Sequence, residues 1–148
     1  MKYFICIIIA ILQISCSIGV NDKIKFQYAV REVFSDVDLN NIDYLVIIPS
    51  QGCGGCITGA ENYYMENRKN RKIKFIFTNI ISMKTLKQKI NIDPHSVFLD
   101  KDNIFLTAYP VEKQIYPVVL KLKNLKITAI YFQSPESDAF GKIKKSLL

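Results

Sequence analysis

The pattern of apolar and polar residues predicts strands that alternate with helices along most of the chain. Residues 44–48 are continuously apolar and end before Pro49, which is typical of a strand buried on both faces of a sheet. A glycine-rich turn follows, and a helix then begins near Ile57. The inward stripe of this helix is expected to hold Ile57, Ala60, Tyr63 and Tyr64, opposite Glu61, Asn62 and Glu66.

The middle of the chain repeats this alternation. Residues 72–79 form a second apolar strand, and Ser82 then caps a helix. Residues 96–99 predict a third strand, which a turn over residues 100–103 closes. Residues 104–106 either pair with this strand or lead into an irregular loop. The helix after Ser82 is expected to turn Met83, Leu86 and Ile90 inward.

The two ends of the folded region carry weaker patterns. Residues 118–122 and 127–132 predict a hairpin about Lys123-Asn124. Ser134-Pro135 then opens a terminal helix, because proline is favoured at the first helical position. Residues 21–41 are polar and predict a tether followed by a short amphipathic helix. The helical stripes hold Phe140, Ile143 and Leu147 at the end, and Val30, Val33, Phe34 and Val37 at the start.

This order of elements predicts an α/β fold, with a central mixed β-sheet flanked by helices on both faces. The first crossovers are long enough to be helical, so the inner strands are expected to be parallel and one edge antiparallel. In such sheets chemistry collects at the carboxyl ends of the strands. The Cys-Gly-Gly-Cys segment over residues 53–56 leaves the carboxyl end of the strand expected to be central.

Length and composition indicate a single domain with a packed hydrophobic core. It has 148 residues, 49% of them hydrophobic, and the aromatic residues are spread along its whole length, which excludes a disordered tail. The net charge of +7 favours solubility and does not by itself indicate a partner. The densest basic cluster, residues 68–74, is expected to be a solvated helix end. No nucleic-acid partner is expected.

The first residues predict export. Lys2 precedes an apolar run over residues 3–12, which is short of the roughly twenty residues that cross a bilayer. The segment ending at Cys16 resembles the lipobox of bacterial lipoproteins, although Gln13 stands where an aliphatic residue is usual. We expect a signal peptide over residues 1–17 with Cys16 acylated, and a membrane-anchored protein facing the periplasm or cell exterior. The alternative is secretory cleavage that releases a soluble chain starting near Ile18.

The number of cysteines agrees with the lipoprotein interpretation. Cys6 lies in the discarded leader and Cys16 is the acylated residue, which leaves Cys53 and Cys56 as the thiols of the mature chain. Cleavage just before Cys16 without acylation would leave an odd third cysteine in an oxidising compartment. Cleavage after Ser17 removes that cysteine again, so both forms of export remain open.

Two cysteines separated by two residues at a helix start are suited to thiol–disulfide exchange. They can close a disulfide within one turn, and the unpaired helix amides stabilise a thiolate on the first sulfur. Cys53 is therefore expected to attack a partner's disulfide, and Cys56 to resolve the mixed disulfide. Gly52, Gly54 and Gly55 leave the approach to Cys53 unhindered.

Three other interpretations compete with exchange. A structural staple is disfavoured, because a two-residue loop constrains the unfolded chain little. A zinc site needs four ligands, and the domain offers two thiols and His95, so copper carried on two thiolates is the better metal hypothesis. A phosphate loop lacks the Lys-Ser/Thr ending and its spacing. No resident metal or cofactor is expected.

Over residues 43–148 the chain resembles the thioredoxin superfamily, and specifically its exported bacterial members. Cys53 and Cys56 match the attacking and resolving cysteines, and Pro117 matches the proline that opens the third core strand. The resemblance implies a cis Pro117 facing the disulfide and a substrate chain received by the backbone of Tyr116. Tyr109-Pro110 is a competing match, but the residues after it make a poor strand.

The sequence departs from the family in several places. Gln51-Gly52 replaces an aromatic residue before the first cysteine, and Gly54-Gly55 replaces the usual dipeptide between the cysteines. The strand over residues 44–48 lacks the buried acid that accepts a proton from the resolving thiol. The long gap before Pro117 implies an insertion over residues 100–114.

Together these features predict a thioredoxin-like domain over residues 42–148, after a tether and short helix over residues 18–41. The expected activity is thiol–disulfide exchange on protein cysteines outside the cytoplasm, with a separate redox partner. The alternative is a non-catalytic lipoprotein of the same fold that binds copper, another metal or a partner protein.

Overall fold

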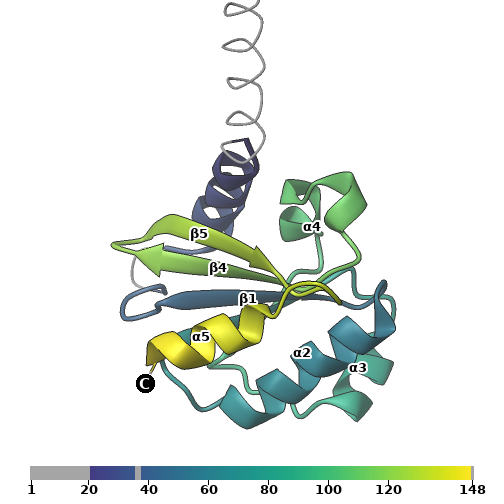
Figure 1. Ribbon diagram of the computed structural model, residues 1–148. Helices are drawn as coiled ribbons and strands as arrows, with labels where there is room; N and C mark the ends of the chain where they lie inside the picture. Colours follow the sequence, from purple (N-terminus) through teal and green to yellow (C-terminus); the bar gives the residue numbers. More distant parts are fainter. Residues whose placement is uncertain (1–20, 36–37, 148) are drawn as a thin grey trace, which may run out of the picture.

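A five-stranded sheet with β1 at its centre organises the molecule (Figure 1). The computed structural model describes residues 21–35 and 38–147. The chain is helical over residues 21–33. The elements that follow are β1 (Tyr44–Pro49), α2 (Gly54–Asn67), β2 (Ile73–Thr78), α3 (Met83–Lys89), β3 (Val97–Leu99), α4 (Ile104–Ala108), the 3₁₀ turn η1 (Val111–Lys113), β4 (Val118–Lys123), β5 (Lys126–Phe132) and α5 (Ala139–Leu147).

The strand order is β3-β2-β1-β4-β5. β1 pairs in parallel with β2, which pairs in parallel with β3, whereas β4 and β5 form the antiparallel side. The predicted mixed sheet with parallel inner strands is therefore confirmed. Because β4 runs against β1, its first residue, Val118, lies opposite Ile47 near the carboxyl end of β1. This edge of the sheet collects the ends of β1, β2 and β3 and the start of β4.

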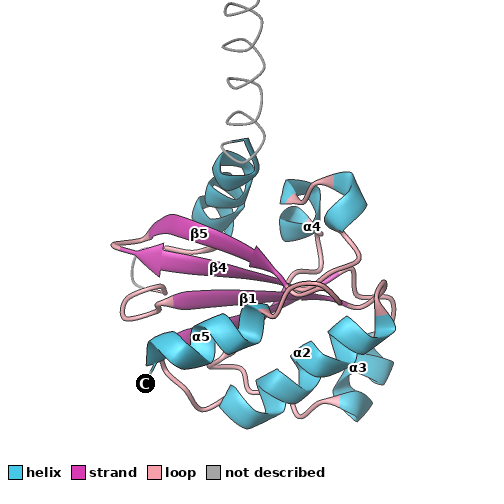
Figure 2. Ribbon diagram, in the orientation of Figure 1, coloured by secondary structure: helices cyan, strands magenta, loops and turns pink. Residues whose placement is uncertain are grey.

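Helices cover both faces of the sheet, as Figure 2 shows. One face carries α2, α3 and α5, and the other carries the helix over residues 21–33 and α4. β1 divides its side chains between them: Leu45 and Ile47 face the N-terminal helix, and Tyr44, Val46 and Ile48 face α2. All six residues of β1 are buried. The prediction of a strand buried on both faces is confirmed.

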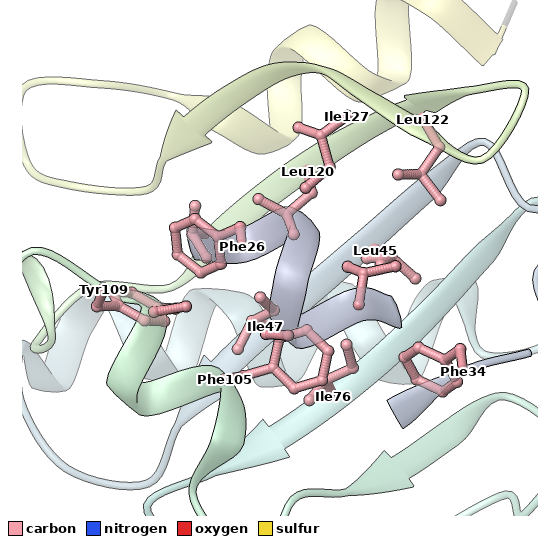
Figure 3. Packing of buried hydrophobic residues seen from close by; sticks show 14 of the residues in the cluster. Phe26, Phe34, Leu45, Ile47, Ile76, Phe105, Tyr109, Leu120, Leu122 and Ile127 are labelled. Carbon is pink, nitrogen blue, oxygen red and sulfur yellow. The ribbon is translucent and has the colours of Figure 1, made fainter. Parts of the chain in front are cut away.

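The N-terminal helix is an integral part of the core. Phe26 is fully buried and packs edge-on against Tyr109, with ring centroids 5.1 Å apart (Figure 3). Ala29, Val30 and Phe34 are buried on the same stripe. An amphipathic helix is thus present within residues 21–41, and the chain is already helical at Asn21, the first described residue. Val37 lies outside the described residues.

Gln27 ties this helix to the β4–β5 hairpin. Its side-chain amide donates to the carbonyl oxygen of Leu125 at 3.2 Å, and its side-chain oxygen accepts from the amide of Ile127 at 2.9 Å. One glutamine therefore pairs with the backbone at the start of edge strand β5 as a neighbouring strand would.

Three predicted elements differ from the structure. Residues 104–106 belong to α4, because the Asp100 carboxylate accepts hydrogen bonds from the amides of Ile104 and Phe105 and so starts a helix. The hairpin turn lies at Asn124-Leu125, one residue later than expected, and both residues have positive φ. This is the backbone that a tight two-residue hairpin requires.

The terminal helix also begins later than predicted, at Ala139 instead of Pro135. Ser134 and Ser137 exchange backbone hydrogen bonds in a closed turn, which keeps the intervening residues out of the helix. The side-chain oxygen of Gln133 then accepts from the amide of Ala139 at 2.8 Å. The helix start is thus set by a glutamine outside the helix and not by the proline.

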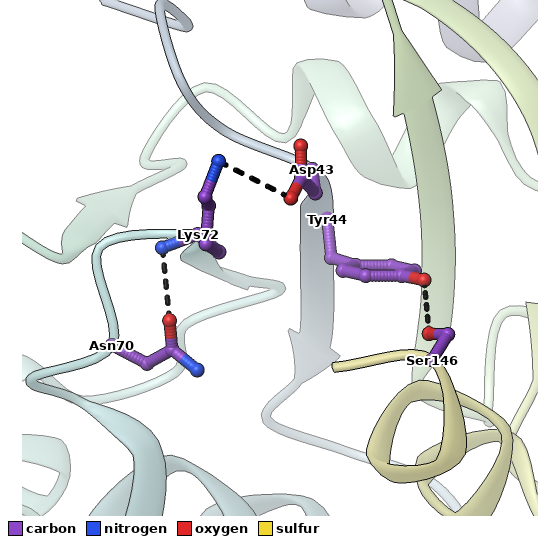
Figure 4. A network of polar contacts seen from close by, with 5 residues as sticks. All are labelled: Asp43, Tyr44, Asn70, Lys72 and Ser146. Carbon is purple, nitrogen blue, oxygen red and sulfur yellow. Dashed lines mark hydrogen bonds and ion pairs between the residues drawn. The ribbon is translucent and has the colours of Figure 1, made fainter. Parts of the chain in front are cut away.

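At the opposite end of the sheet a polar network joins β1 to its neighbours (Figure 4). Lys72 pairs with Asp43 at 3.5 Å, and the amide of Lys72 donates to the side-chain oxygen of Asn70. The hydroxyls of Tyr44 and Ser146 share a hydrogen bond, which connects β1 to α5. These contacts hold the amino-terminal end of β1, far along the strand from the cysteines.

Among residues 21–35 and 38–147, no helix has the length and apolar character to cross a membrane. The leader and Cys16 lie outside the described residues, so the signal peptide, the acylation and the boundary near residue 18 stay predictions.

Candidate functional site

Cys53 and Cys56 form a disulfide at the first turn of α2, with their Cα atoms 5.3 Å apart. Cys53 is the N-cap residue, and its backbone is extended, whereas α2 begins at Gly54. Cys56 is buried at 8% exposure, and Cys53 is partly exposed. Of the two cysteines, Cys53 is therefore the more exposed.

The electrostatic surroundings of Cys53 favour a thiolate. α2 has fourteen residues, and its first turn contains no acidic side chain. The side chain of the N-cap residue, Cys53, makes no capping hydrogen bond, so it leaves the amides of the first turn of α2 available. The positive end of the helix dipole and these amides stabilise a negative sulfur at the N-cap.

A backbone contact joins the cysteine turn to the loop before β4. The amide of Cys53 donates to the carbonyl oxygen of Ile115 at 3.0 Å. Gly52 has a φ of +138°, and a Cβ added there would lie 2.4 Å from the same oxygen. Only glycine fits this conformation and this close approach. The glycine before the first cysteine is thus a steric requirement, which the sequence pattern did not indicate.

The peptide bond before Pro117 is trans. The described backbone contains no cis peptide bond, so the expected cis Tyr116–Pro117 bond is wrong. Pro117 still directly precedes β4 at the edge that holds the cysteines. The amide of Tyr116 donates to the carbonyl oxygen of Lys113 at 3.0 Å, and it is the carbonyl oxygen of Ile115 that accepts from the amide of Cys53. The role of Tyr116 and Pro117 in substrate binding stays a prediction.

Buried Asp100 holds the segment that leads to this loop. Its side chain is 1% exposed, and it accepts from the hydroxyl of Thr78 at 2.8 Å besides the two α4 amides. Asn103 accepts from the amide of Asn79 at 2.9 Å. The ends of β2 and β3 are thereby fixed to α4. The segment expected as an insertion, residues 100–114, contains α4 and η1.

Glu61 is buried at 8% exposure, although the sequence pattern placed it on the solvent side of α2. It forms an ion pair with Lys89 of α3 at 2.6 Å, which offsets the cost of burying its charge. The spacing of Ile57, Ala60, Glu61 and Tyr64 matches one helical face, so the signal was present in the sequence.

The two tyrosines of α2 have separate surroundings. Tyr64 is fully buried, and its hydroxyl donates to the carbonyl oxygen of Asn91 and accepts from the amide of Asp93. Tyr63 is half-buried and stacks on Phe140 with centroids 4.6 Å apart. Tyr64 is therefore a core residue. Burial raises the pKa of Tyr63 to about 12, with smaller contributions from Tyr44 and Glu66.

Metal-ligating groups do not gather in the described part of the chain. No three His, Cys, Asp or Glu side chains there are placed to hold one ion. His95 is exposed, and its amide donates to the Asp93 carboxylate at 2.9 Å.

The comparisons identify a related fold. No family model matches the chain, and no curated protein matches it. The solution structure of a protein from Neisseria meningitidis proposed to be a thioredoxin is similar, with a TM-score of 0.51 and 20% sequence identity over 77% of each chain. Taken with the sheet order and the Cys53–Cys56 disulfide at the start of α2, this similarity shows that the chain has a thioredoxin-like fold.

Proposed function

We propose that the protein is a thiol–disulfide oxidoreductase that acts on protein cysteines outside the cytoplasm. The observation that carries this proposal is the Cys53–Cys56 disulfide at the start of α2, with Cys53 accessible and Cys56 buried. This asymmetry separates an attacking sulfur from a resolving one. The thioredoxin-like fold supports the same chemistry, because it places the pair at a helix N-terminus.

The reaction transfers two electrons between dithiol and disulfide. In the reducing direction the Cys53 thiolate attacks a substrate disulfide, a bond forms between the two sulfurs, and the other substrate sulfur leaves as a thiolate. The Cys56 thiol loses its proton to solvent, and its sulfur then attacks Cys53. The second substrate thiolate leaves, and the Cys53–Cys56 disulfide is restored. Oxidation of a substrate dithiol is the same sequence in reverse, and a separate redox partner resets the pair.

Exposed apolar side chains near the cysteines favour a protein substrate. Ile115, whose carbonyl group contacts Cys53, is 43% exposed, and Val111 of the same loop is 80% exposed. We propose that an extended substrate segment lies across this loop beside Tyr116 and Pro117. Exposed apolar groups of this kind contribute binding energy when a partner covers them.

The proposed location of the protein outside the cytoplasm is argued from the first sixteen residues of the sequence. The positive and apolar segment over residues 2–12 and the lipobox-like segment before Cys16 support export and a lipid anchor. Intact-mass analysis of the protein from the membrane fraction tests this proposal. We expect an acylated chain that begins at Cys16, and a Cys16→Ser variant without lipid. A mature chain that begins near Ile18 would instead establish secretion.

The reduction potential of the Cys53–Cys56 pair tests the activity. We expect a reversible two-electron transition between about −120 and −270 mV, the range of exchange proteins. Its position distinguishes an oxidant from a reductase. A potential below roughly −300 mV would indicate a structural disulfide instead.

Trapping of substrates provides a second, independent test. A Cys56→Ser variant lacks the resolving sulfur and should accumulate mixed disulfides through Cys53. A Cys53→Ser variant is the matched control, because Cys56, the thiol that remains among the described residues, is buried and should trap nothing. Absence of adducts on the Cys56→Ser variant would contradict exchange, and loss of bound copper in both variants would indicate a carrier.

A further inference from the structure

A groove of about 420 Å³ lies at the outer edge of β5, the last strand of the sheet (Figure 1). β5 pairs with β4 on one side, and no other strand of the described residues pairs with it. The groove extends to Tyr116, which directly follows the residue whose carbonyl oxygen accepts from Cys53. Its lining includes Lys113, Tyr116, Ile130, Tyr131, Phe132 and Lys142. It therefore begins beside the loop that contacts the cysteine turn.

The backbone of β5 presents hydrogen-bonding groups to this groove. The amide of Gln133 donates to the carbonyl oxygen of Pro117 at 2.8 Å, so every second residue before Gln133 also turns its backbone groups toward β4. The N–H and C=O groups of Ile130 and Phe132 therefore point outward, away from β4. Outward groups of this kind on an edge strand are a template for another extended segment.

Two lysines lie on opposite faces of the same edge. Lys142 of α5 lies 4.8 Å from the ring centroid of Tyr131, on the face of the sheet that α2 and α5 cover. Lys113 of η1 lies 4.7 Å from the ring centroid of Phe132, on the other face. Neither ammonium group is in an ion pair with a carboxylate of the described residues. The groove thus carries two unpaired positive charges against one acidic lining residue, Glu136.

We propose that this groove binds an extended acidic segment of the protein undergoing exchange, which adds to β5 as a further strand. The backbone of the segment pairs with Ile130 and Phe132. Because consecutive residues of a strand point to opposite faces, two consecutive acidic residues place one carboxylate toward Lys142 and the other toward Lys113. The inference rests on the proposed function, because it names the class of substrate that the same exchange reaction takes.

Sheet geometry limits where the acidic pair lies in the substrate. A segment added to β5 is three strand spacings from β1, or about 14 Å. Cys53 follows the carboxyl end of β1, so the substrate has to cover at least this distance. An extended chain does so in about four residues. The acidic pair is therefore expected about four to six residues from the substrate cysteine.

Binding of cysteine-free peptides to the full chain tests the groove without any exchange. Three fluorescein-labelled peptides carry Glu-Glu, Glu-Thr-Glu or Gln-Gln in one Thr- and Val-rich sequence, and fluorescence anisotropy gives each Kd. We expect Glu-Glu to bind about ten times tighter than Gln-Gln, the effect of two exposed ion pairs.

The Glu-Thr-Glu peptide separates this geometry from general attraction. It carries the same charge, but both carboxylates point to one face of a strand, so it should bind about three times more weakly than Glu-Glu. Equal binding of the two peptides would mean that only the net charge of +7 attracts them, and would overturn the proposal.

Substitutions locate the binding. Lys113→Gln and Lys142→Gln should each weaken binding of the Glu-Glu peptide about threefold, and Glu136→Gln should strengthen it about twofold. Lys145→Gln is the control, because this exposed lysine of α5 is not among the residues that line the groove, and it should leave the Kd unchanged. Unchanged binding in both groove variants would mean that these lysines only protect an exposed edge from aggregation, which contradicts the proposal.

Hydrogen exchange of individual amides tests the strand pairing. Saturating Glu-Glu peptide should slow exchange at the amides of Ile130 and Phe132. The amide of Ile127 is the internal control, because it already donates to Gln27 and should be unaffected. Unchanged exchange at both Ile130 and Phe132 would refute the added strand.

Exchange kinetics connect the groove to the proposed function. Two peptides carry a cysteine in a mixed disulfide with thionitrobenzoate, about five residues from Glu-Glu or Gln-Gln. The reduced full chain should release thionitrobenzoate about ten times faster from the Glu-Glu peptide at low peptide concentration. Dithiobis(nitrobenzoate), a small disulfide without neighbouring residues, reports the reactivity of the cysteines alone.

The two ways to fail are distinct. A chain that reacts with the small disulfide but shows no preference between the peptides would overturn the acidic subsite alone. A chain that binds the Glu-Glu peptide but exchanges neither the peptides nor the small disulfide would overturn the proposed function.

Discussion

The backbone amide of Cys53 donates a hydrogen bond to the carbonyl oxygen of Ile115 at 3.0 Å. This contact joins the turn that carries the reactive cysteine to the loop that precedes β4. The two segments approach so closely that Gly52 has no room for a side chain. The position of the Cys53 sulfur therefore depends on the loop over residues 109–116.

A Gly52→Ala substitution should separate these two segments. The new Cβ would lie 2.4 Å from the Ile115 oxygen, in a backbone conformation that alanine avoids. We expect the free energy of unfolding to fall by about 2 kcal/mol, as urea denaturation measures, and the exchange rate to fall as well. Gly55→Ala is the control, because a Cβ there meets nothing within 4 Å. A helical alanine should raise stability by about 0.5 kcal/mol. Equal stabilities of the two variants would refute the close approach.

Asp100→Ala should be among the more damaging single changes. The substitution leaves the Thr78 hydroxyl and the amides of Ile104 and Phe105 without their common acceptor in a buried place. We expect a loss of about 3 kcal/mol in the free energy of unfolding. Asp102→Ala, on the exposed side of the same turn, should change stability by less than about 0.5 kcal/mol. A mild effect of Asp100→Ala would mean that α4 starts without it.

Tyr109→Phe should stabilise the protein. The Tyr109 hydroxyl is buried and unpaired among the described residues, so its removal relieves a desolvation cost of about 1 kcal/mol. Tyr64→Phe is the opposite case, because the Tyr64 hydroxyl has two partners, and we expect it to cost about 1 to 3 kcal/mol. Thermal melts of the two variants compare them directly. A Tyr109→Phe variant that melts earlier than wild type would reveal a partner for this hydroxyl.

Alkaline pH should destabilise the protein partly through Tyr63. Burial raises the pKa of Tyr63 from 10.0 to about 12, so the folded state keeps a proton that the unfolded state releases. The contribution is complete below pH 10 and is lost as the pH rises to about 12. Burial also raises the pKa of Tyr109, which adds a decline of the same sign. In denaturation experiments over this range, Tyr63→Phe should lose less stability than wild type. Parallel curves for the two proteins would show that Tyr63 does not contribute.

The sheet could be predicted because its strands coincide with runs of apolar residues in the sequence. Residues 44–48 are apolar enough to indicate burial on both faces, and residues 72–79 contain a second apolar run. The crossover between them is long enough for a helix. Their order alone predicts parallel pairing and places Cys53 at the carboxyl end of a central strand. Two cysteines at helical spacing complete the chemical part of the prediction.

The helices that differ from the prediction, α4 and α5, have starts that are set by side chains outside the helices themselves. Asp100 starts α4 from the preceding turn, and Gln133 starts α5 across a closed turn. Both contacts span only four to six residues, but aspartate at residue 100 is equally typical of a turn, and glutamine is not a preferred capping residue. The contact between Gly52 and Ile115 joins segments far apart in the sequence, so local preferences could not indicate it. It depends on backbone atoms, which leave no trace in side-chain patterns.

Glu61 is a different case. The spacing of residues along the helix indicated its buried position, but the interpretation placed it on the solvent side. It falls on the same helical face as Ile57 and Tyr64, but its charge favoured the solvent side. Burial became acceptable because Lys89 of α3 provides a counter-charge, which only tertiary structure brings close.

The contacts of Gln27 also constrain the order in which the molecule assembles. They join residues 98 and 100 positions apart, the first described helix and the last hairpin. As the chain is synthesised, the apolar stripe around Phe26 must wait until Ile127 has emerged before it finds its complete partner surface. A chain that stops short of the hairpin would leave this stripe uncovered and open to aggregation. Late completion of the fold is thus built into the sequence, independently of any redox chemistry.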